Sequence, residues 1–482
     1  MSLQSLLHFL VILFEVVFLF NVMIVVHELG HFLAARWRGL VVERFGVWFG
    51  HPLWKKEIGG VTYSLGWIPA GGFVALPQMI PNEDNKEGEG EPSRRQLPAV
   101  SPKDKIIVAL AGPVFSLLLA VIFALVVYVV GRPVSESELT TVIGYVVKDS
   151  PADRAGLRAG DKILKIDGHP VQRFQGMDND SVTWNIVRSE GSTIAVEVER
   201  EGKILHFDVV PVKEERSAFQ RKSLRQIFIM PAQTPTVAKV FPGSPAEAAS
   251  IKPNDQILEV DGQKLYSPFL LNDYVASHPQ KEMTFLIKRA GRTFTVRIKP
   301  TYPEGEKVPR IGLLWDLNGQ MTLSHPGPIE QLKASVSAMF NVLQAVLSPK
   351  SDIKPQHLSG PIGIMRFYYM LFESPHGWRL ALWFSVLFNV NAALINLFPI
   401  PVLDGGHILL GVVEWIRGRP LNIKLLEALQ TVFATLLIGY MLYVTFFDVQ
   451  EIPWKSKGNV PELKFHSKEE ATSSRSHLES AK

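Results

Sequence analysis

Four long apolar stretches constrain this chain more than any other feature of its sequence. They cover residues 6–26, 106–130, 380–401 and 425–447. As helices rising about 1.5 Å per residue, all four are long enough to cross the roughly 30 Å of hydrocarbon in a bilayer. Apolar residues make up 47% of the chain and gather in these stretches. The sequence therefore predicts a polytopic α-helical membrane protein with four transmembrane helices.

The placement of Lys and Arg predicts how these spans are oriented. Basic residues crowd the segment between the first two stretches and the short connection between the last two, whereas none precedes the first stretch. Because cytoplasmic loops carry the excess of Lys and Arg, both segments should be cytoplasmic, and the amino terminus and the long middle region should lie outside. The net charge of +4 gathers beside the spans, so we expect no nucleic-acid binding. No basic residue precedes the first stretch and no small-residue cleavage site follows it, which predicts a retained span and not a secretory signal.

The middle region contains an internal repeat. Residues 151–168 and 245–262 align without gaps, and eight of the eighteen positions are identical. Each copy is expected to form a short helix, a strand and a tight Asp-Gly turn, which predicts two tandem β-rich domains. The repeat resembles bacterial PDZ domains, whose grooves bind peptide C-termini beside a sheet edge. Ser250 and Asn254 replace two glycines of the first copy, so two interpretations stay open: peptide binding in one or both grooves, or a rigid cap or spacer.

A helical stripe of apolar residues follows the repeat within 328–347. Such a stripe is typical of a helix that lies on the membrane surface or packs against protein, and both alternatives remain open.

His27, Glu28 and His31 form a His-Glu-x-x-His motif at the inner end of the first stretch. Two histidines four residues apart share one helical face and can both bind one Zn²⁺. Glu28 can then accept a proton from a water activated by the metal and deliver it to the leaving amine. The string also occurs by chance, but ionisable residues at a span are costly unless they are paired or ligated. The chain has no cysteine, which excludes thiolate metal sites and a cysteine nucleophile. The motif therefore predicts a zinc protease site.

A catalytic zinc needs a third protein ligand and an open position. The first and third stretches both run inward, so Asp404, at the inner end of the third, should lie at the depth of His27 and His31. His407 is the alternative ligand, but it lies farther along the chain, and we favour Asp404.

Pro399 and Pro401 interrupt the helix just before Asp404, because proline has no N–H to donate. Broken backbone inside a membrane is tolerated only beside protein or a wet cavity. We expect water and substrate to reach the metal here, with Asn391 and Asn396 bonding to a substrate backbone. Ordinary hydrogen bonds between helices are the alternative role for the two asparagines.

The motifs His-Glu-Leu-Gly-His at 27–31 and Asn-x-x-Pro-x-Pro-x-Leu-Asp-Gly at 396–405 together resemble the site-two protease family of intramembrane zinc metalloproteases. The resemblance extends to about residue 450. It implies zinc held by His27, His31 and Asp404, with Glu28 as the general acid and base and Asn396 in contact with substrate.

The resemblance also implies substrates and a location. The substrates would be single-span membrane proteins already trimmed on their outer side, such as an anti-sigma factor in envelope stress signalling, and remnant signal peptides. The protein would lie in a bacterial inner membrane and contact its lipids. The amino terminus and the PDZ pair would be in the periplasm, and the active site would face the cytoplasm. The PDZ pair would exclude substrates with bulky outer domains.

Two further elements of the family have counterparts here. A membrane-associated β-hairpin matches residues 60–76, with a tight bend expected at Gly71 and Gly72. It would add a strand to an unwound substrate, because a helical substrate must lose its own hydrogen bonds before cleavage. The segment 358–364 resembles an element before the third span, and the sequence assigns it no chemical role.

These predictions divide the chain into ten parts. They are a first transmembrane helix (1–33), a cytoplasmic loop with the hairpin (34–104), a second transmembrane helix (105–131), two PDZ domains (132–220 and 221–305), an amphipathic and pre-span segment (306–378), a third transmembrane helix (379–404), a cytoplasmic loop (405–424), a fourth transmembrane helix (425–448) and a flexible tail (449–482). Two other functions remain open: a membrane zinc protease that cuts soluble or misfolded proteins, and a non-catalytic scaffold built around the PDZ pair.

Overall fold

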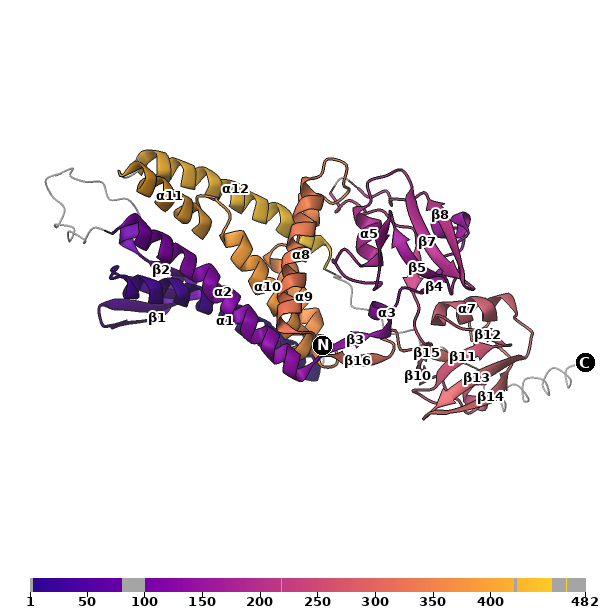
Figure 1. The fold of residues 1–482 in the computed structure, drawn as a ribbon. Coiled ribbons are helices and arrows are strands. Elements are labelled where there is room, and N and C mark those ends of the chain that lie inside the picture. Colours follow the sequence, from indigo (N-terminus) through magenta and orange to yellow (C-terminus); the bar gives the residue numbers. More distant parts are fainter. Residues whose placement is uncertain (1–2, 80–99, 218, 420–422, 453–464, 466–482) are drawn as a thin grey trace, which may run out of the picture. The chain divides into compact units, whose positions relative to one another are not determined.

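The computed structural model describes residues 3–79, 100–217, 219–419, 423–452 and 465 (Figure 1). The chain forms two compact units. The membrane unit comprises Met1–Arg132, Ser324–Phe340 and Leu358–Gln450, and the PDZ unit comprises Pro133–Leu323, Asn341–His357 and Glu451–Lys482. Part of the predicted cytoplasmic loop and nearly all of the predicted tail lie outside the described residues.

Four helices of the described chain are long and apolar enough to span a membrane, as predicted. They are α1 (Leu3–Trp37), α2 (Pro102–Val130), α10 (Gly377–Asn396) and α12 (Ile423–Gln450). Helix α2 packs against α1, α10 and α11 (Asp404–Arg417), and α1 and α2 lie side by side in Figure 1. Their shared core is apolar and includes Ile12, Val16, Ala120, Ala124 and Val390.

The segment predicted as the cytoplasmic loop 405–424 is mostly helical. The prolines end α10 at Asn396, and after a short turn the chain begins α11 at Asp404 itself. Helix α11 packs closely on α2: a Cβ added at Gly411 would lie 2.8 Å from Ile106. Glu414 on the same helix pairs with Lys105 of α2 at 3.0 Å. These contacts with α2 explain why the segment is ordered as a helix.

The hairpin is longer than predicted and turns elsewhere. Strands β1 (Arg44–Ile58) and β2 (Val61–Ala75) are joined at Gly59 and Gly60, both with positive φ. Gly71 and Gly72, predicted to form the bend, lie within β2. Residues 44–47 pair both with 62–65 and with 72–75, so this part of β1 has an antiparallel neighbour on each side. The short helix η1 (Pro77–Met79) follows.

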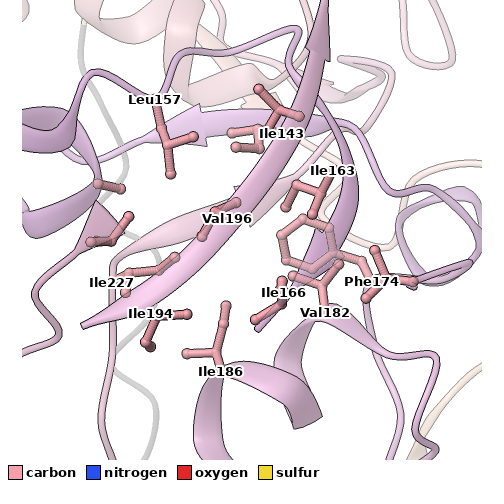
Figure 2. Close-up of a cluster of buried hydrophobic side chains, with 14 residues drawn as sticks. Ile143, Leu157, Ile163, Ile166, Phe174, Val182, Ile186, Ile194, Val196 and Ile227 are labelled. Carbon is pink, nitrogen blue, oxygen red and sulfur yellow. The ribbon is translucent and has the colours of Figure 1, made fainter. Parts of the chain in front are cut away.

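The first half of the PDZ unit has a four-stranded sheet in the order β6-β5-β7-β8 and a two-stranded sheet β4-β9. Figure 2 shows its core, in which Ile143, Ile163, Val196 and Ile227 meet. The elements are β4 (Ile143–Val146), α4 (Pro151–Ala155), β5 (Lys162–Ile166), β6 (His169–Pro170), α5 (Val182–Arg188), β7 (Ile194–Arg200), β8 (Lys203–Val209) and β9 (Ile229–Pro231).

The second half repeats this arrangement with the sheets β12-β11-β13-β14 and β10-β15. Its elements are β10 (Val237–Val240), α6 (Pro245–Ala248), β11 (Gln256–Val260), β12 (Gln263–Lys264), α7 (Pro268–Ser277), β13 (Met283–Arg289), β14 (Arg292–Ile298) and β15 (Leu313–Trp315). In each half the last strand pairs back with the first, so the domains end at β9 and β15, beyond the predicted boundaries at 220 and 305. Strand β3 (Arg132–Ser135), which leads into α3 (Glu136–Leu139), pairs with β16 (Met321–Ser324).

The predicted amphipathic helix is α8 (Pro328–Leu347), and apolar residues in each of its halves pack within the unit to which that half belongs. Leu332 and Val336 pack in the core of the membrane unit, and Val342 and Val346 in a cluster of the PDZ unit. The helices η2 (Pro355–His357) and α9 (Pro361–Glu373) follow.

The 358–364 segment now has a structural role, because it forms the amino terminus of α9. The buried carboxylate of Asp448, near the end of α12, accepts hydrogen bonds from the backbone N–H groups of Gly360 (2.8 Å) and Gly363 (2.9 Å). A negative charge at this end of a helix is stabilising, since the first N–H groups have no partner within the helix. Asp448 therefore joins α12 to α9.

Candidate active site

His27, Glu28 and His31 lie on one turn of α1, where that helix comes very close to α2. A Cβ added at Gly30 would lie 2.5 Å from the carbonyl oxygen of Ala111. A Cβ added at Gly112 would lie 2.2 Å from His31 Nε2. Glycine at these two positions lets the helices approach and leaves room for the two imidazoles. Gly112 was not predicted from the sequence, although the Gly-Pro pair it forms with Pro113 inside an apolar span is a visible signal.

The structure brings Asp404 to the two histidines. His27 Nε2 lies 3.3 Å from Asp404 Oδ2, and His31 Nε2 lies 3.3 Å from Asp404 Oδ1. One candidate ligand atom from each residue falls within 4.8 Å of the others. Within the described chain this is the group of His, Asp and Glu residues arranged to hold a metal ion. His407, the alternative ligand, lines the same cavity but is not a member of this group.

The second nitrogen of each histidine has its own partner on α2. His31 Nδ1 lies 2.8 Å from the carbonyl oxygen of Val108, which can only accept, so Nδ1 carries the proton and Nε2 keeps its lone pair. His27 Nδ1 lies 3.0 Å from the hydroxyl of Ser116. Such outer partners set the tautomer and ring orientation of metal-binding histidines. Ser116 is a second residue that the sequence analysis missed.

The donor set fits a zinc ion. Asp404 Oδ2 is buried and accepts no hydrogen bond, although buried polar atoms nearly always have a partner. It faces the imidazole nitrogens of His27 and His31, and a cation between these atoms would satisfy all of them. Two imidazole nitrogens and one carboxylate oxygen, with a position left for water, is a ligand set typical of catalytic zinc.

Glu28 and the hairpin share a cavity of about 830 Å³ with the metal-binding group. Residues 71–76 of β2 and its continuation form one wall. The contact is close, because a Cβ added at Gly72 would lie 3.0 Å from Glu28 Cγ and 3.1 Å from Ile24. Gly71 and Gly72 therefore border the cavity, even though they do not form the turn.

Of the other residues predicted to contact substrate, one lines the cavity and three do not. Asn396, the last residue of α10, lines the cavity, and its Nδ2 lies 3.5 Å from His27 Nε2. Asn391, Pro399 and Pro401 are not among the residues that line it. Asn389 lines it in place of Asn391. Spacings of three and four residues put 389, 392 and 396 on one helical face, a signal that would have selected Asn389.

Comparison with known proteins supplies the family. The profile of Peptidase family M50 matches residues 15–440. This chain belongs to the M50 family. A Neisseria meningitidis protein whose name describes a zinc metalloprotease is 31% identical over 459 residues, with 89% of this chain and 97% of that protein covered. The regulator of sigma-E protease RseP of Salmonella typhimurium is 28% identical over 458 residues, covering 88% and 96%. RseP of Escherichia coli is 27% identical over 463 residues, covering 90% and 97%.

A solved structure matches one part of the chain. The PDZ domain of an SdrC-like protein from Listeria monocytogenes is 24% identical, covers 18% of this chain and 95% of that domain, and gives a TM-score of 0.17. Membership of M50 makes this protein a zinc metalloprotease of the site-two type, as predicted. The predicted fold class is also confirmed, with four apolar helices and two β-rich PDZ domains.

Proposed function

We propose that this M50 protease hydrolyses peptide bonds within the transmembrane segments of single-span membrane proteins. The observation that carries the proposal is the convergence of His27, His31 and Asp404 on apolar, span-length helices and the helix that follows them, beside a cavity that also contains Glu28. A hydrolytic site at this place acts on chains that enter the membrane. The substrates we propose are proteins already trimmed on their outer side, such as an anti-sigma factor, and remnant signal peptides.

The relatives support the stress-signalling part of the proposal. Two of them are named as regulators of sigma-E and align over nearly their whole length. We place the protein in a bacterial inner membrane, with the amino terminus and PDZ unit in the periplasm and the catalytic cavity toward the cytoplasm. The Lys and Arg residues beside the spans support this orientation.

The proposed roles follow from the contacts of each residue. His27, His31 and Asp404 would hold Zn²⁺, which when bound polarises the scissile carbonyl and makes water more acidic. Glu28, on the cavity wall, accepts a proton from the attacking water and returns it to the leaving amine. Ser116 and the carbonyl of Val108 orient the two imidazoles. Asn396 and Asn389 offer side-chain amides to the substrate backbone.

Strand β2 would hold the substrate in an extended form. Residues 72–75 pair with 44–47 and also border the cavity. A substrate strand added here would replace the helical hydrogen bonds that it lost on unwinding. Gly72 allows this strand to approach Glu28 closely.

One experiment tests the whole proposal. The purified protein is reconstituted in lipid with a single-span substrate lacking its outer domain, and the products are mapped by mass with and without a zinc chelator. We expect cleavage inside the transmembrane sequence that stops on chelation and is absent in Glu28→Gln. Cuts confined to loops or to soluble proteins would instead support the alternative of a membrane protease that acts at the cytoplasmic face.

A further inference from the structure

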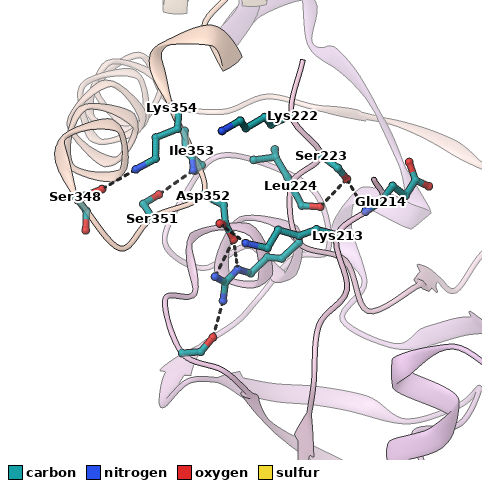
Figure 3. A network of polar contacts seen from close by, with 12 residues as sticks. Lys213, Glu214, Lys222, Ser223, Leu224, Ser348, Ser351, Asp352, Ile353 and Lys354 are labelled. Carbon is teal, nitrogen blue, oxygen red and sulfur yellow. Dashed lines mark hydrogen bonds and ion pairs between the residues drawn. The ribbon is translucent and has the colours of Figure 1, made fainter. Parts of the chain in front are cut away.

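Residues 341–357 of the PDZ unit, here called the strap, hold a carboxylate in a site built from the first PDZ domain. Figure 3 shows this network. The Asp352 carboxylate accepts from Lys213 Nζ at 2.7 Å through Oδ1 and from Arg225 Nε at 2.8 Å through Oδ2. Arg225 Nη2 lies 2.8 Å from the same Oδ2. Both oxygens of Asp352 therefore have basic partners.

Arg225 belongs to the domain and is prepared to receive a carboxylate. Only 6% of its side chain is exposed, and its Nη1 donates to the carbonyl of Gly191 at 2.9 Å. The hydrogen bond to Gly191 fixes the guanidinium so that Nε and Nη2 both face Asp352. This planar pair of donors suits a carboxylate. Burial alone would raise the pKa of Asp352, but the hydrogen bonds from Lys213 and Arg225 outweigh it and lower that pKa, so the Asp352 carboxylate is ionised at neutral pH.

The rest of the strap also lies on the first PDZ domain. Ile353 is 5% exposed and packs in a cluster with Trp184 of α5, Ala345 and Leu224. His357 Nε2 lies 2.9 Å from the carbonyl of Lys222. Further hydrogen bonds join Asn341 to Met177 and Ser348 to Glu190. The strap thus contacts α5 and the segment 213–226.

These two contacted elements border the place where a PDZ domain receives a peptide. The segment 213–226 leads directly into β9, which in the described sheet pairs only with β4, and α5 is the helix of the same domain. PDZ domains bind by adding a strand to such an edge and capturing the terminal carboxylate. In the second PDZ domain, α7, β15 and the residues before β15 line a cavity of about 300 Å³.

We propose that Arg225 and Lys213 form the carboxylate anchor of the first PDZ domain, and that Asp352 of the strap occupies it as a built-in ligand that a peptide carboxylate must displace. The strap continues at one end into the first half of α8 and at the other into α9, whose residues Leu332, Val336 and Tyr368 pack in the core of the membrane unit. The strap is therefore covalently joined at both ends to helices of the membrane unit, and displacing it would move the chain next to those helices.

Cross-linking tests whether Asp352 holds the strap in place. Because the chain has no cysteine, Glu190→Cys and Ser348→Cys introduce a unique reporter pair at a contact between the strap and the domain. The pair is placed in the full-length Glu28→Gln protein, and a short bismaleimide measures docking. We expect efficient cross-linking that falls roughly tenfold when Asp352→Asn is added, since the charged partner is lost. Lys165→Ala, which removes an ion pair with Glu197 elsewhere in the domain, is the matched control and should leave the rate unchanged.

Peptide binding tests the competition directly. A fluorescent peptide of residues 348–357 is titrated by anisotropy into the same Glu28→Gln protein without the reporter cysteines. Because the built-in ligand reduces the competent fraction, Asp352→Asn in the protein should tighten binding roughly tenfold. Arg225→Ala in the protein, or Asp352→Asn in the peptide, should abolish it. A peptide ending at Asp352 with a free carboxyl, compared with its amide, then shows whether a chain terminus adds to the side chain.

Each outcome decides the proposal. Cross-linking that is unaffected by Asp352→Asn, or absent in the parent pair, overturns it, as does equal peptide affinity in wild type and Asp352→Asn. Thermal melting of each variant excludes general unfolding, and Arg225→Lys, which keeps the charge, should retain part of the binding. Neither assay measures proteolysis. Both can therefore be interpreted even if the proposed protease function proves wrong.

Discussion

Buried carboxylates occur in both units, but their partners differ. In the first PDZ domain the Asp161 carboxylate is 1% exposed and accepts from Arg200 Nε at 2.6 Å and Nη2 at 2.7 Å, and from the backbone N–H of Arg158 at 2.8 Å. In the membrane unit Asp404 faces two imidazoles, and its buried Oδ2 accepts no hydrogen bond.

The second PDZ domain repeats the complete arrangement. Asp255 accepts from Arg289 Nε and Nη2 at 2.6 Å and from the backbone N–H of Lys252 at 2.8 Å. Each of these Asp–Arg pairs joins segments within its own domain, and removing one partner would leave the other uncompensated. The unpartnered Oδ2 of Asp404 differs in that it lies beside two imidazoles, where a cation could bind. Asp161 and Asp255 thus have the contacts of structural acids, whereas Asp404 has those expected of a metal ligand.

The largest expected effect is at Asp404, the proposed metal ligand. Asp404→Ala should lose bound zinc, whereas Glu28→Gln should keep zinc but lower the cleavage rate by about 10³-fold, as expected for removing a general acid and base. Zinc content by elemental analysis and cleavage of a single-span substrate measure the two effects. Full zinc content in Asp404→Ala would contradict the assignment of this aspartate as a ligand.

The structural acids should show the opposite pattern. Asp161→Ala leaves the Arg200 guanidinium without its main partner and should destabilise the first PDZ domain by about 3 kcal/mol. Asp404→Ala should leave the stability of the metal-free protein unchanged or higher. Thermal unfolding of both chelator-treated variants provides the comparison. If both lose stability equally, hydrogen-bond completeness does not distinguish the two kinds of acid.

A smaller effect is expected where the hairpin meets Glu28. Gly72→Ala places a Cβ 3.0 Å from Glu28 Cγ, so Glu28 or the strand must shift by a few tenths of an ångström. We expect the cleavage rate to fall about tenfold with zinc content unchanged, because catalysis depends on close positioning. Gly439→Ala on α12, where nothing lies within 4 Å, is the control and should keep full activity.

The smallest effect is expected on the stability of the second PDZ domain, at the positions where Ser250 and Asn254 replace glycines of the first. Ser250 and Asn254 adopt the left-handed conformation, with φ of 58° and 69°, and Gly156 and Gly160 do so in the first domain, with φ of 93° and 94°. Ser250→Gly should therefore stabilise the second domain by about 1 kcal/mol by removing a strained Cβ. A raised melting temperature confirms this, and a lowered one shows that the serine side chain compensates for its backbone.

Periodicity and motif spacing were enough to predict the spans, the repeat and the His27–His31 pair. These features depend on residues near one another in the chain, where helix geometry alone decides which side chains share a face. The direction of the spans extended this reasoning to Asp404. The PDZ fold tolerates Ser250 and Asn254 because it requires only the left-handed backbone at these positions, not glycine itself.

The tertiary structure alone decided the contacts between distant segments. Ser116 meets His27 across 89 residues, and Arg225 meets Asp352 across 127. The position of the hairpin turn also depends on the pairing register of β1 and β2. Both Gly59–Gly60 and Gly71–Gly72 could have formed a turn, and the register places it at Gly59–Gly60. No local pattern encodes such choices, because they depend on how whole elements pack. The sequence by itself therefore predicted the candidate metal ligands, and tertiary packing determined which residues contact them and where the strap lies.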